Sequence, residues 1–215
     1  MQWAYRPFGP FSLSNLASGS YSVLITLYFF SKLLDGAVTP ALSHILKKGT
    51  RSEFEADLGM LFSWSKFSSS TVVPIFATCK SFGDKFSEKD IKDLEYLGQQ
   101  IPNAILVFST FRDALDKSET YLLKLLVKRS RKRRKARKTF NQVMVLTGTE
   151  LFSEYGPPDC LEDGNVEQKR LRKSYERYQG IDELCDATQQ IYLGFKSWDV
   201  EIHEYYENKR LKRKK

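Results

Sequence analysis

The chain has 215 residues, of which 41% are hydrophobic, and a formal net charge of +8 at pH 7. This length and composition suit one sizeable domain with a buried core and exclude wholesale disorder. The three cysteines form no Cys-x-x-Cys pair and there are only two histidines, which makes a structural zinc site improbable. The excess of positive charge favours an anionic partner.

The composition also bears on location. A sparse, odd number of cysteines fits a reducing compartment. No signal peptide is recognised at Met1, and the most apolar run, Tyr21–Phe30, is too short to cross a bilayer, which needs ~20 residues. We therefore expect a cytoplasmic protein without membrane contact.

The N-terminal region predicts an arm and two helices. Met1–Ser14 is rich in proline, glycine and aromatic residues and is expected to be an extended arm packed on the body. A helix is predicted from Asn15 to about Asp35, because apolar residues recur at helical spacing and a glycine follows. A second short helix is predicted over Pro40–Lys48, with proline in its first turn.

The middle of the chain alternates strands and helices. Strands are predicted over about Phe54–Trp64, with a neighbour near Lys66–Phe67, and over Val72–Cys79. These are followed by a helix from Glu88 to about Gln100 opened by a capping box of Ser87 and Asp90, a strand over Ala104–Phe108, a helix capped by Ser118, and a strand over Val143–Thr147. This order predicts an α/β sandwich, with a mixed sheet between helices.

After Phe152 the composition changes, and Gly156-Pro157-Pro158 breaks the chain. We predict a core with its N-terminal arm over 1–155, a polar linker over 156–180 and a helical appendage with a basic tail over 181–215. Two helices are expected in the appendage, Ile181–Leu193 and Trp198–Leu211.

Polar residues gather where two of the predicted strands meet. Thr78 and Lys80 project from the same face of their strand, and Cys79 points away. Glu55 and Asp57 share a face of the preceding strand. A strand-end lysine in a surface ion pair with an acid is the structural alternative to a catalytic role.

Asp57, followed after about twenty residues by Thr78-Cys79-Lys80, resembles the PD-(D/E)xK superfamily of restriction-endonuclease-like nucleases. That family carries Asp on one strand and Glu-x-Lys on the next. The likeness covers roughly Asn15–Phe152 and includes the stretches SFGDKFSEKDIKDLEYLGQQIPNAILVFSTFRD and QVMVLTGTELF. It implies the αβα sandwich of these enzymes, Mg²⁺- or Mn²⁺-dependent phosphodiester hydrolysis, a bacterial restriction or phage-defence context, and a helicase or ATPase partner.

The resemblance also implies roles for single residues. Asp57 would ligate the metal together with the carbonyl oxygen of Cys79, and Lys80 would position water or stabilise developing negative charge. Thr78 stands where the family has its glutamate, and a neutral hydroxyl does not replace a carboxylate. Three explanations are open: a pseudonuclease that still binds nucleic acid, an engineered substitution at Thr78, or a relocated acid supplied by Glu55.

A dense basic run, Lys128–Lys138, lies between a predicted helix and a core strand and is expected to be a helix end or a loop. Phosphates would relieve its internal repulsion, so we predict nucleic-acid binding, with DNA favoured over RNA; an acidic protein partner is the alternative. The predicted nucleic-acid-binding residues are Lys128, Arg129, Arg131, Lys132, Arg133, Arg134, Lys135, Arg137 and Lys138. The tail Lys209–Lys215 repeats this chemistry.

Two functions therefore remain open at this point. The first is a nucleic-acid-binding protein with a nuclease fold, active with Mg²⁺ or inactivated at Thr78. The second is a non-catalytic interaction module of a larger helicase- or ATPase-containing complex. A homodimer formed through a sheet edge or the C-terminal helices is compatible with either function.

Overall fold

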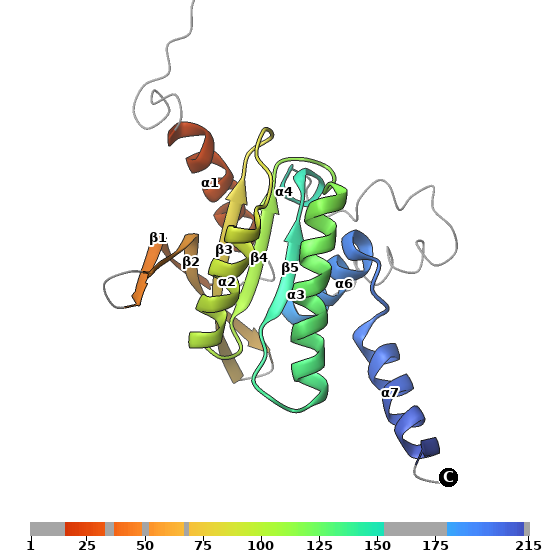
Figure 1. Cartoon of the computed structure of the whole chain (residues 1–215). Helices are drawn as coiled ribbons and strands as arrows, with labels where there is room; N and C mark the ends of the chain where they lie inside the picture. The colour runs from red at the N-terminus through yellow and green to blue at the C-terminus, as the bar shows by residue number, and fades with distance from the viewer. Residues whose placement is uncertain (1–15, 33–36, 49–51, 67–68, 153–179, 213–215) are drawn as a thin grey trace, which may run out of the picture.

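The computed structural model describes residues 16–32, 37–48, 52–66, 69–152 and 180–212 (Figure 1). The predicted N-terminal arm and nearly all of the predicted linker lie outside these residues. Among the described helices, none is long and apolar enough to cross a membrane.

A five-stranded mixed sheet with the strand order β1-β2-β3-β4-β5 forms the centre of the molecule. β1 pairs antiparallel with β2 and β2 antiparallel with β3, whereas β3–β4 and β4–β5 are parallel. The parallel pairs are joined by helical crossovers, as such pairs require. The strands are β1 (Ala37–Lys48), β2 (Ser52–Lys66), β3 (Ser69–Lys80), β4 (Ile105–Thr110) and β5 (Gln142–Leu146).

Helices cover both faces of the sheet (Figure 1). Side chains alternate along each strand, so β4 sends Ile105 and Val107 to one core cluster and Leu106 and Phe108 to the other. α1 and α6 cover the first face, and α2 and α3 cover the second. The helices are α1 (Leu16–Lys32), α2 (Glu88–Gln100), α3 (Lys117–Lys135), α4 (Gly148–Phe152), α6 (Ile181–Leu193) and α7 (Trp198–Lys212).

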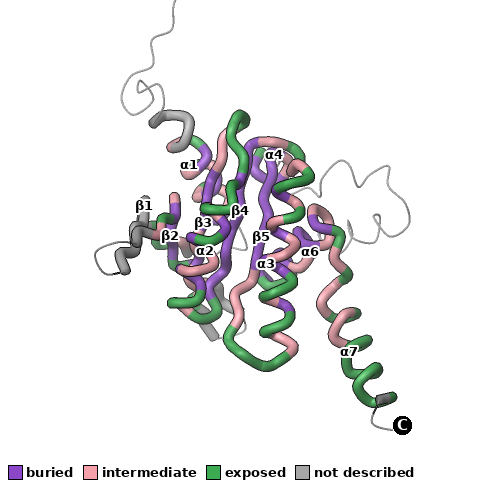
Figure 2. The backbone as a smooth tube through the Cα atoms, viewed as in Figure 1, coloured by how far each residue is buried: buried purple, intermediate pink, exposed green. Residues whose placement is uncertain are grey.

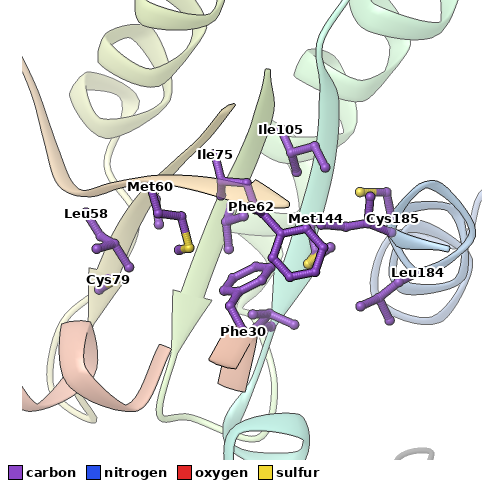
Figure 3. Packing of buried hydrophobic residues seen from close by; sticks show 14 of the residues in the cluster. Phe30, Leu58, Met60, Phe62, Ile75, Cys79, Ile105, Met144, Leu184 and Cys185 are labelled. Atoms are coloured by element: carbon purple, nitrogen blue, oxygen red, sulfur yellow. The ribbon is translucent and has the colours of Figure 1, made fainter. Parts of the chain in front are cut away.

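The αβα sandwich with a mixed sheet and C-terminal helices, predicted from the sequence, is thus the observed architecture. Figure 3 shows how Phe30 of α1, Phe62 of β2 and Met144 of β5 meet Leu184 of α6 in the first core cluster. α6 is therefore packed into the sandwich, whereas α7 runs outward from it and is mostly exposed (Figure 2).

The predicted helix over Pro40–Lys48 is wrong: these residues belong to β1. Proline suits the first turn of a helix, but Pro40 pairs with Met60 in an antiparallel ladder with β2. β1 is an edge strand of the described sheet, and a proline is tolerated there because one side of the strand needs no backbone donor.

The helix caps agree with the sequence in one case and differ in the other. The capping box of Ser87 and Asp90 opens α2 as predicted. α3 is capped by Asp116 rather than by Ser118, and Glu119 completes a capping box with Asp116. Glu119 is fully buried and also binds Arg112, which explains why the cap lies two residues earlier than predicted.

Candidate functional site

The predicted catalytic residues lie where β2 separates from β3. The ladder between these strands ends at the pair Leu58–Ala77, while β2 continues to Ser52 in its pairing with β1. Asp57 and Thr78 are the next residues beyond that last pair. β3 continues along β4 until Lys80 lies beside Thr110. We call this point, with Asp57, Thr78 and Lys80, the fork.

Asp57 is held by hydrogen bonds to β3. Its Oδ2 atom accepts one from the Thr78 hydroxyl at 3.0 Å and one from the Cys79 backbone N–H at 2.7 Å. Thr78 is only 4% exposed. The Asp57 carboxylate therefore occupies the position of a ladder partner for β3, and it satisfies a buried hydroxyl and a backbone amide.

Lys80 does not pair with Asp57. Its Nζ atom lies 2.8 Å from Oδ1 of Asp90, and Oδ2 of Asp90 accepts hydrogen bonds from the backbone N–H and the hydroxyl of Ser87. Burial raises the pKa of Asp90, but hydrogen bonds from Lys80 and Ser87 outweigh it and hold that pKa below its ordinary value. Lys80 thus ties the end of β3 to the cap of α2.

Cys79 points to the other face of the sheet, as predicted. Its thiol packs in the core cluster beneath α1 and lies 3.6 Å from the Thr26 hydroxyl, which in turn contacts the Ser109 hydroxyl. Burial raises the pKa of the thiol to about 12, so it is a neutral packing group. Its predicted role concerned only the backbone carbonyl oxygen, and that role stays a prediction.

The side chains around the fork do not fit a divalent metal. Mg²⁺ prefers several oxygen ligands, commonly including one or two carboxylates. Thr78 and Cys79 both bind Oδ2 of Asp57, which leaves Oδ1 as the one carboxylate oxygen without a described hydrogen bond, and Glu55 is exposed. Among the described residues, no group of three or more His, Cys, Asp or Glu side chains is arranged to hold a metal ion. The Mg²⁺ or Mn²⁺ implied by the resemblance is therefore not supported by the residues at the fork.

Much of the basic run is engaged by the chain's own residues. Arg129 makes two hydrogen bonds to Glu95 of α2, and Arg133 donates to the Thr139 carbonyl. Arg131 is 6% exposed and lies in a network with α6 and α7. Burial lowers the pKa of Arg134, whose guanidinium stacks on the Trp198 ring at 4.2 Å. Arg131 and Arg134 are therefore poorly placed to be primary phosphate ligands, whereas Arg129 and Arg133 are exposed and would bind phosphate only by giving up these surface contacts.

Lys135 is half-buried and its ammonium group pairs with Glu201 of α7, whereas the remaining cations of the run face solvent. Lys128 and Lys132 lie on the outer side of α3, and Arg137 and Lys138 follow its end; all four are exposed. Within the described part of the chain, no carboxylate pairs with their side chains. They are the members of the predicted set that could bind phosphate without first breaking an internal contact.

The fork and the basic run lie at opposite ends of the sandwich. Lys80 ends β3 next to the carboxyl end of β4. α3 connects β4 to the parallel strand β5, so it runs back along the sheet and its basic end reaches the amino ends of the strands (Figure 1). Its 19 residues rise about 28 Å. Phosphates bound at the basic run would therefore lie far from the fork.

Several residues that shape both regions were missed from the sequence. Asp90 was recognised as a helix cap but not as the partner of Lys80, and Asp186 and Glu201 were not expected to meet Arg131. Their separation in sequence carries no signal of contact. The capping box of Ser87 and Asp90 is the one sequence feature that marks any of these residues as structurally important.

Comparison with known proteins adds little to this geometry. No protein-family model matches the chain, and no curated protein matches it. Among solved structures, the restriction endonuclease MspJI in complex with a 27-mer oligonucleotide is similar, with a TM-score of 0.29 and 10% identity. The match covers 86% of this chain and 39% of that chain. At this distance, functional conclusions have to come from the residues of the chain itself.

Proposed function

We propose that this chain is a nucleic-acid-binding protein with a nuclease-like fold, and that its fork does not hydrolyse phosphodiesters. The observation that carries the proposal is the pairing at the fork. The Asp57 carboxylate is bound by Thr78 and by the Cys79 amide, and the Lys80 amine is bound by Asp90. Both groups that would act on a phosphate serve instead to hold β2, β3 and α2 together.

The chemistry of Thr78 supports this proposal. Hydrolysis of a phosphodiester needs an activated water and a stabilised negative charge, and a metal held by carboxylates supplies both. A threonine hydroxyl adds no charge to the single carboxylate of Asp57. Glu55, the acid that could have replaced the missing one, is exposed and makes no described contact with Asp57.

The exposed cations support the binding part of the proposal. Four basic side chains at the end of α3 face solvent on a chain with a net charge of +8. Phosphate contacts by such side chains release counterions, which gives affinity that falls steeply with salt. We propose DNA as the preferred nucleic acid.

A comparison of wild type with Thr78→Glu and Thr78→Gln tests the catalytic part. We expect no cleavage of labelled DNA by the wild type with Mg²⁺ or Mn²⁺, and no metal binding by calorimetry. Thr78→Glu places a second carboxylate next to Asp57 and should gain metal affinity, whereas Thr78→Gln, of nearly the same size but neutral, should not. Cleavage by the wild type that disappears in Asp57→Asn would overturn the proposal.

Binding is tested by fluorescence anisotropy of labelled duplex DNA, single-stranded DNA and RNA over a range of salt concentrations. For duplex DNA, log K should fall linearly with log salt, by about 0.9 for each phosphate contact. Absence of measurable binding to all three at low salt would overturn the binding part. It would favour the module that docks on an acidic protein, since the chain's own carboxylates already bind Arg131 and Lys135.

The wider setting belongs to the same proposal. A bacterial phage-defence role, a helicase or ATPase partner, a homodimer and a cytoplasmic location follow from the sequence resemblance and composition alone. Co-purification of the tagged chain with an ATPase from its native cells would support the partner, and light scattering would decide the oligomeric state.

A further inference from the structure

α7 is attached to the basic half of α3 through side chains of the basic run. Glu201 of α7 accepts hydrogen bonds at 2.5 Å from both Arg131 and Lys135. Arg134 stacks on Trp198, the first residue of α7. The part of the run that does not face solvent therefore positions α7.

The base of α7 is fixed from a second side as well. Asp186 of α6 accepts a hydrogen bond from the Trp198 backbone N–H at 3.1 Å and another from Arg131 at 2.7 Å. Arg131 also donates to Gln189 and to the Lys196 carbonyl. A buried guanidinium with this many partners holds the turn between α6 and α7 in one arrangement.

Beyond Glu201, α7 runs into solvent. Every residue from 203 to 211 is exposed, and Figure 2 shows this half of the helix leaving the sandwich. We call residues 203–211 the projecting half of α7. It carries Lys209 and Arg210, which lie about 12 Å and about 14 Å along the helix from Glu201. The acid nearest its start, Glu204, is paired with Lys196 at 2.6 Å.

We propose that the projecting half of α7 is the second part of a binding surface for double-stranded nucleic acid. Lys128, Lys132, Arg137 and Lys138 would hold one stretch of the backbone, and Lys209 and Arg210 would hold another. The inference rests on the proposed function and assigns it a surface at the end of the sandwich opposite the fork. Glu201 and Arg131 are positioning residues, because they fix α7 relative to α3 without contacting the ligand.

The length of this surface favours a duplex over a smaller phosphate ligand. A duplex carries one negative charge for about every 1.7 Å of its axis, so it presents phosphates along the whole of α7. A mononucleotide would reach only one of the two groups of cations. Two cation groups on rigid helices also suit a stiff ligand, since DNA bends little over tens of base pairs.

Charge reversal at the two ends of the molecule tests the surface. We compare a double variant of α7, Lys209→Glu and Arg210→Glu, with a control double variant, Lys85→Glu and Lys117→Glu. The control makes an equal charge change at two exposed residues just before α2 and at the start of α3, at the fork end of the sandwich. The α7 variant should make the slope of log K against log salt for duplex DNA shallower by about 2, reflecting two lost contacts. The control should leave the slope unchanged. Equal effects of both variants would overturn the proposal.

A second test separates positioning from net charge, using Glu201→Ala and Glu204→Ala. Each removes one negative charge from α7, which by electrostatics alone should strengthen DNA binding. Glu201→Ala also frees the base of α7, so we expect it to weaken duplex binding several-fold while Glu204→Ala strengthens it slightly. Stronger binding by Glu201→Ala would show that α7 masks the basic run instead of extending the surface.

The two failures are distinguishable. If the wild type shows no salt-dependent binding to nucleic acid, the proposed function fails. If the wild type binds and Lys132→Glu weakens binding while the α7 variant does not, only the assignment of α7 fails. Tighter binding of single strands than of duplexes would overturn the choice of ligand.

Discussion

The fork and the basic end of α3 contain the two groups of polar residues that stand out in the sequence. They differ in how far the chain's own residues bind their charged groups. At the fork, Asp57, Thr78 and Lys80 all bind neighbouring groups of the chain. At the basic end, Lys128 and Lys132 face solvent. A residue type that suits a function supports that function only when the fold leaves its charged group free to meet a ligand.

The basic end itself divides into structural and exposed cations, and the largest expected effect tests that division. Arg131→Ala leaves Asp186 and Glu201 without their buried partner, which should lower the free energy of unfolding by about 3–5 kcal/mol. Urea denaturation measures this change. Lys132→Ala, at the exposed neighbouring position, should change stability by less than about 0.5 kcal/mol. Equal losses of stability in the two variants would show that Arg131 is no more structural than Lys132.

The carboxyl end of the sheet, where the fork lies, is tightly packed at Gly148. A Cβ atom at this position would lie 2.5 Å from the Phe111 carbonyl oxygen, so the backbone would have to move. Gly148→Ala should therefore cost about 1–3 kcal/mol. Gly83→Ala is the control, since nothing lies within 4 Å of its added methyl group. Thermal unfolding of both variants decides whether this end is as closely packed as described.

Asp57→Ala asks whether the fork is structural. The substitution leaves the buried Thr78 hydroxyl and the Cys79 amide without an acceptor, which should cost about 1–3 kcal/mol of stability. Binding of duplex DNA to the folded variant should be unchanged, because the proposed binding surface lies at the other end. Glu55→Ala, at an exposed position, should alter neither quantity. Lost DNA binding with unchanged stability would reverse the roles assigned to the two regions.

The smallest expected effect is a pH dependence from Glu150 of α4. Burial raises the pKa of this carboxyl above its usual value, although hydrogen bonds from Tyr192 and Thr147 partly oppose the rise. Its contribution to stability should be fully present below about pH 4.5 and lost as the pH rises through the raised folded-state pKa. The slope is at most about 1.4 kcal/mol per pH unit. Glu150→Gln should remove this slope from denaturation curves measured between pH 4 and 9.

The sequence by itself determined most of the architecture. Apolar runs such as Ala104–Phe108 predicted strands buried on both faces, and the capping box at Ser87 located the start of α2. These features depend on residues close together in the chain, where periodicity and local hydrogen bonds are readable. The prediction for Pro40–Lys48 was wrong because proline also suits the first turn of a helix, and only pairing with β2 decides in favour of a strand.

Only the tertiary structure decided what the polar residues do. The sequence placed Asp57, Thr78 and Lys80 near one another. It could not show that Lys80 forms an ion pair with Asp90, or that the Thr78 hydroxyl donates a hydrogen bond to Asp57. It also could not divide the basic run between cations that hold α7 and cations that face solvent. The physical reason is the same in each case: whether a charge is free depends on partners brought from distant parts of the chain. Those partners, Asp186 and Glu201 among them, are chosen by packing rather than by local pattern.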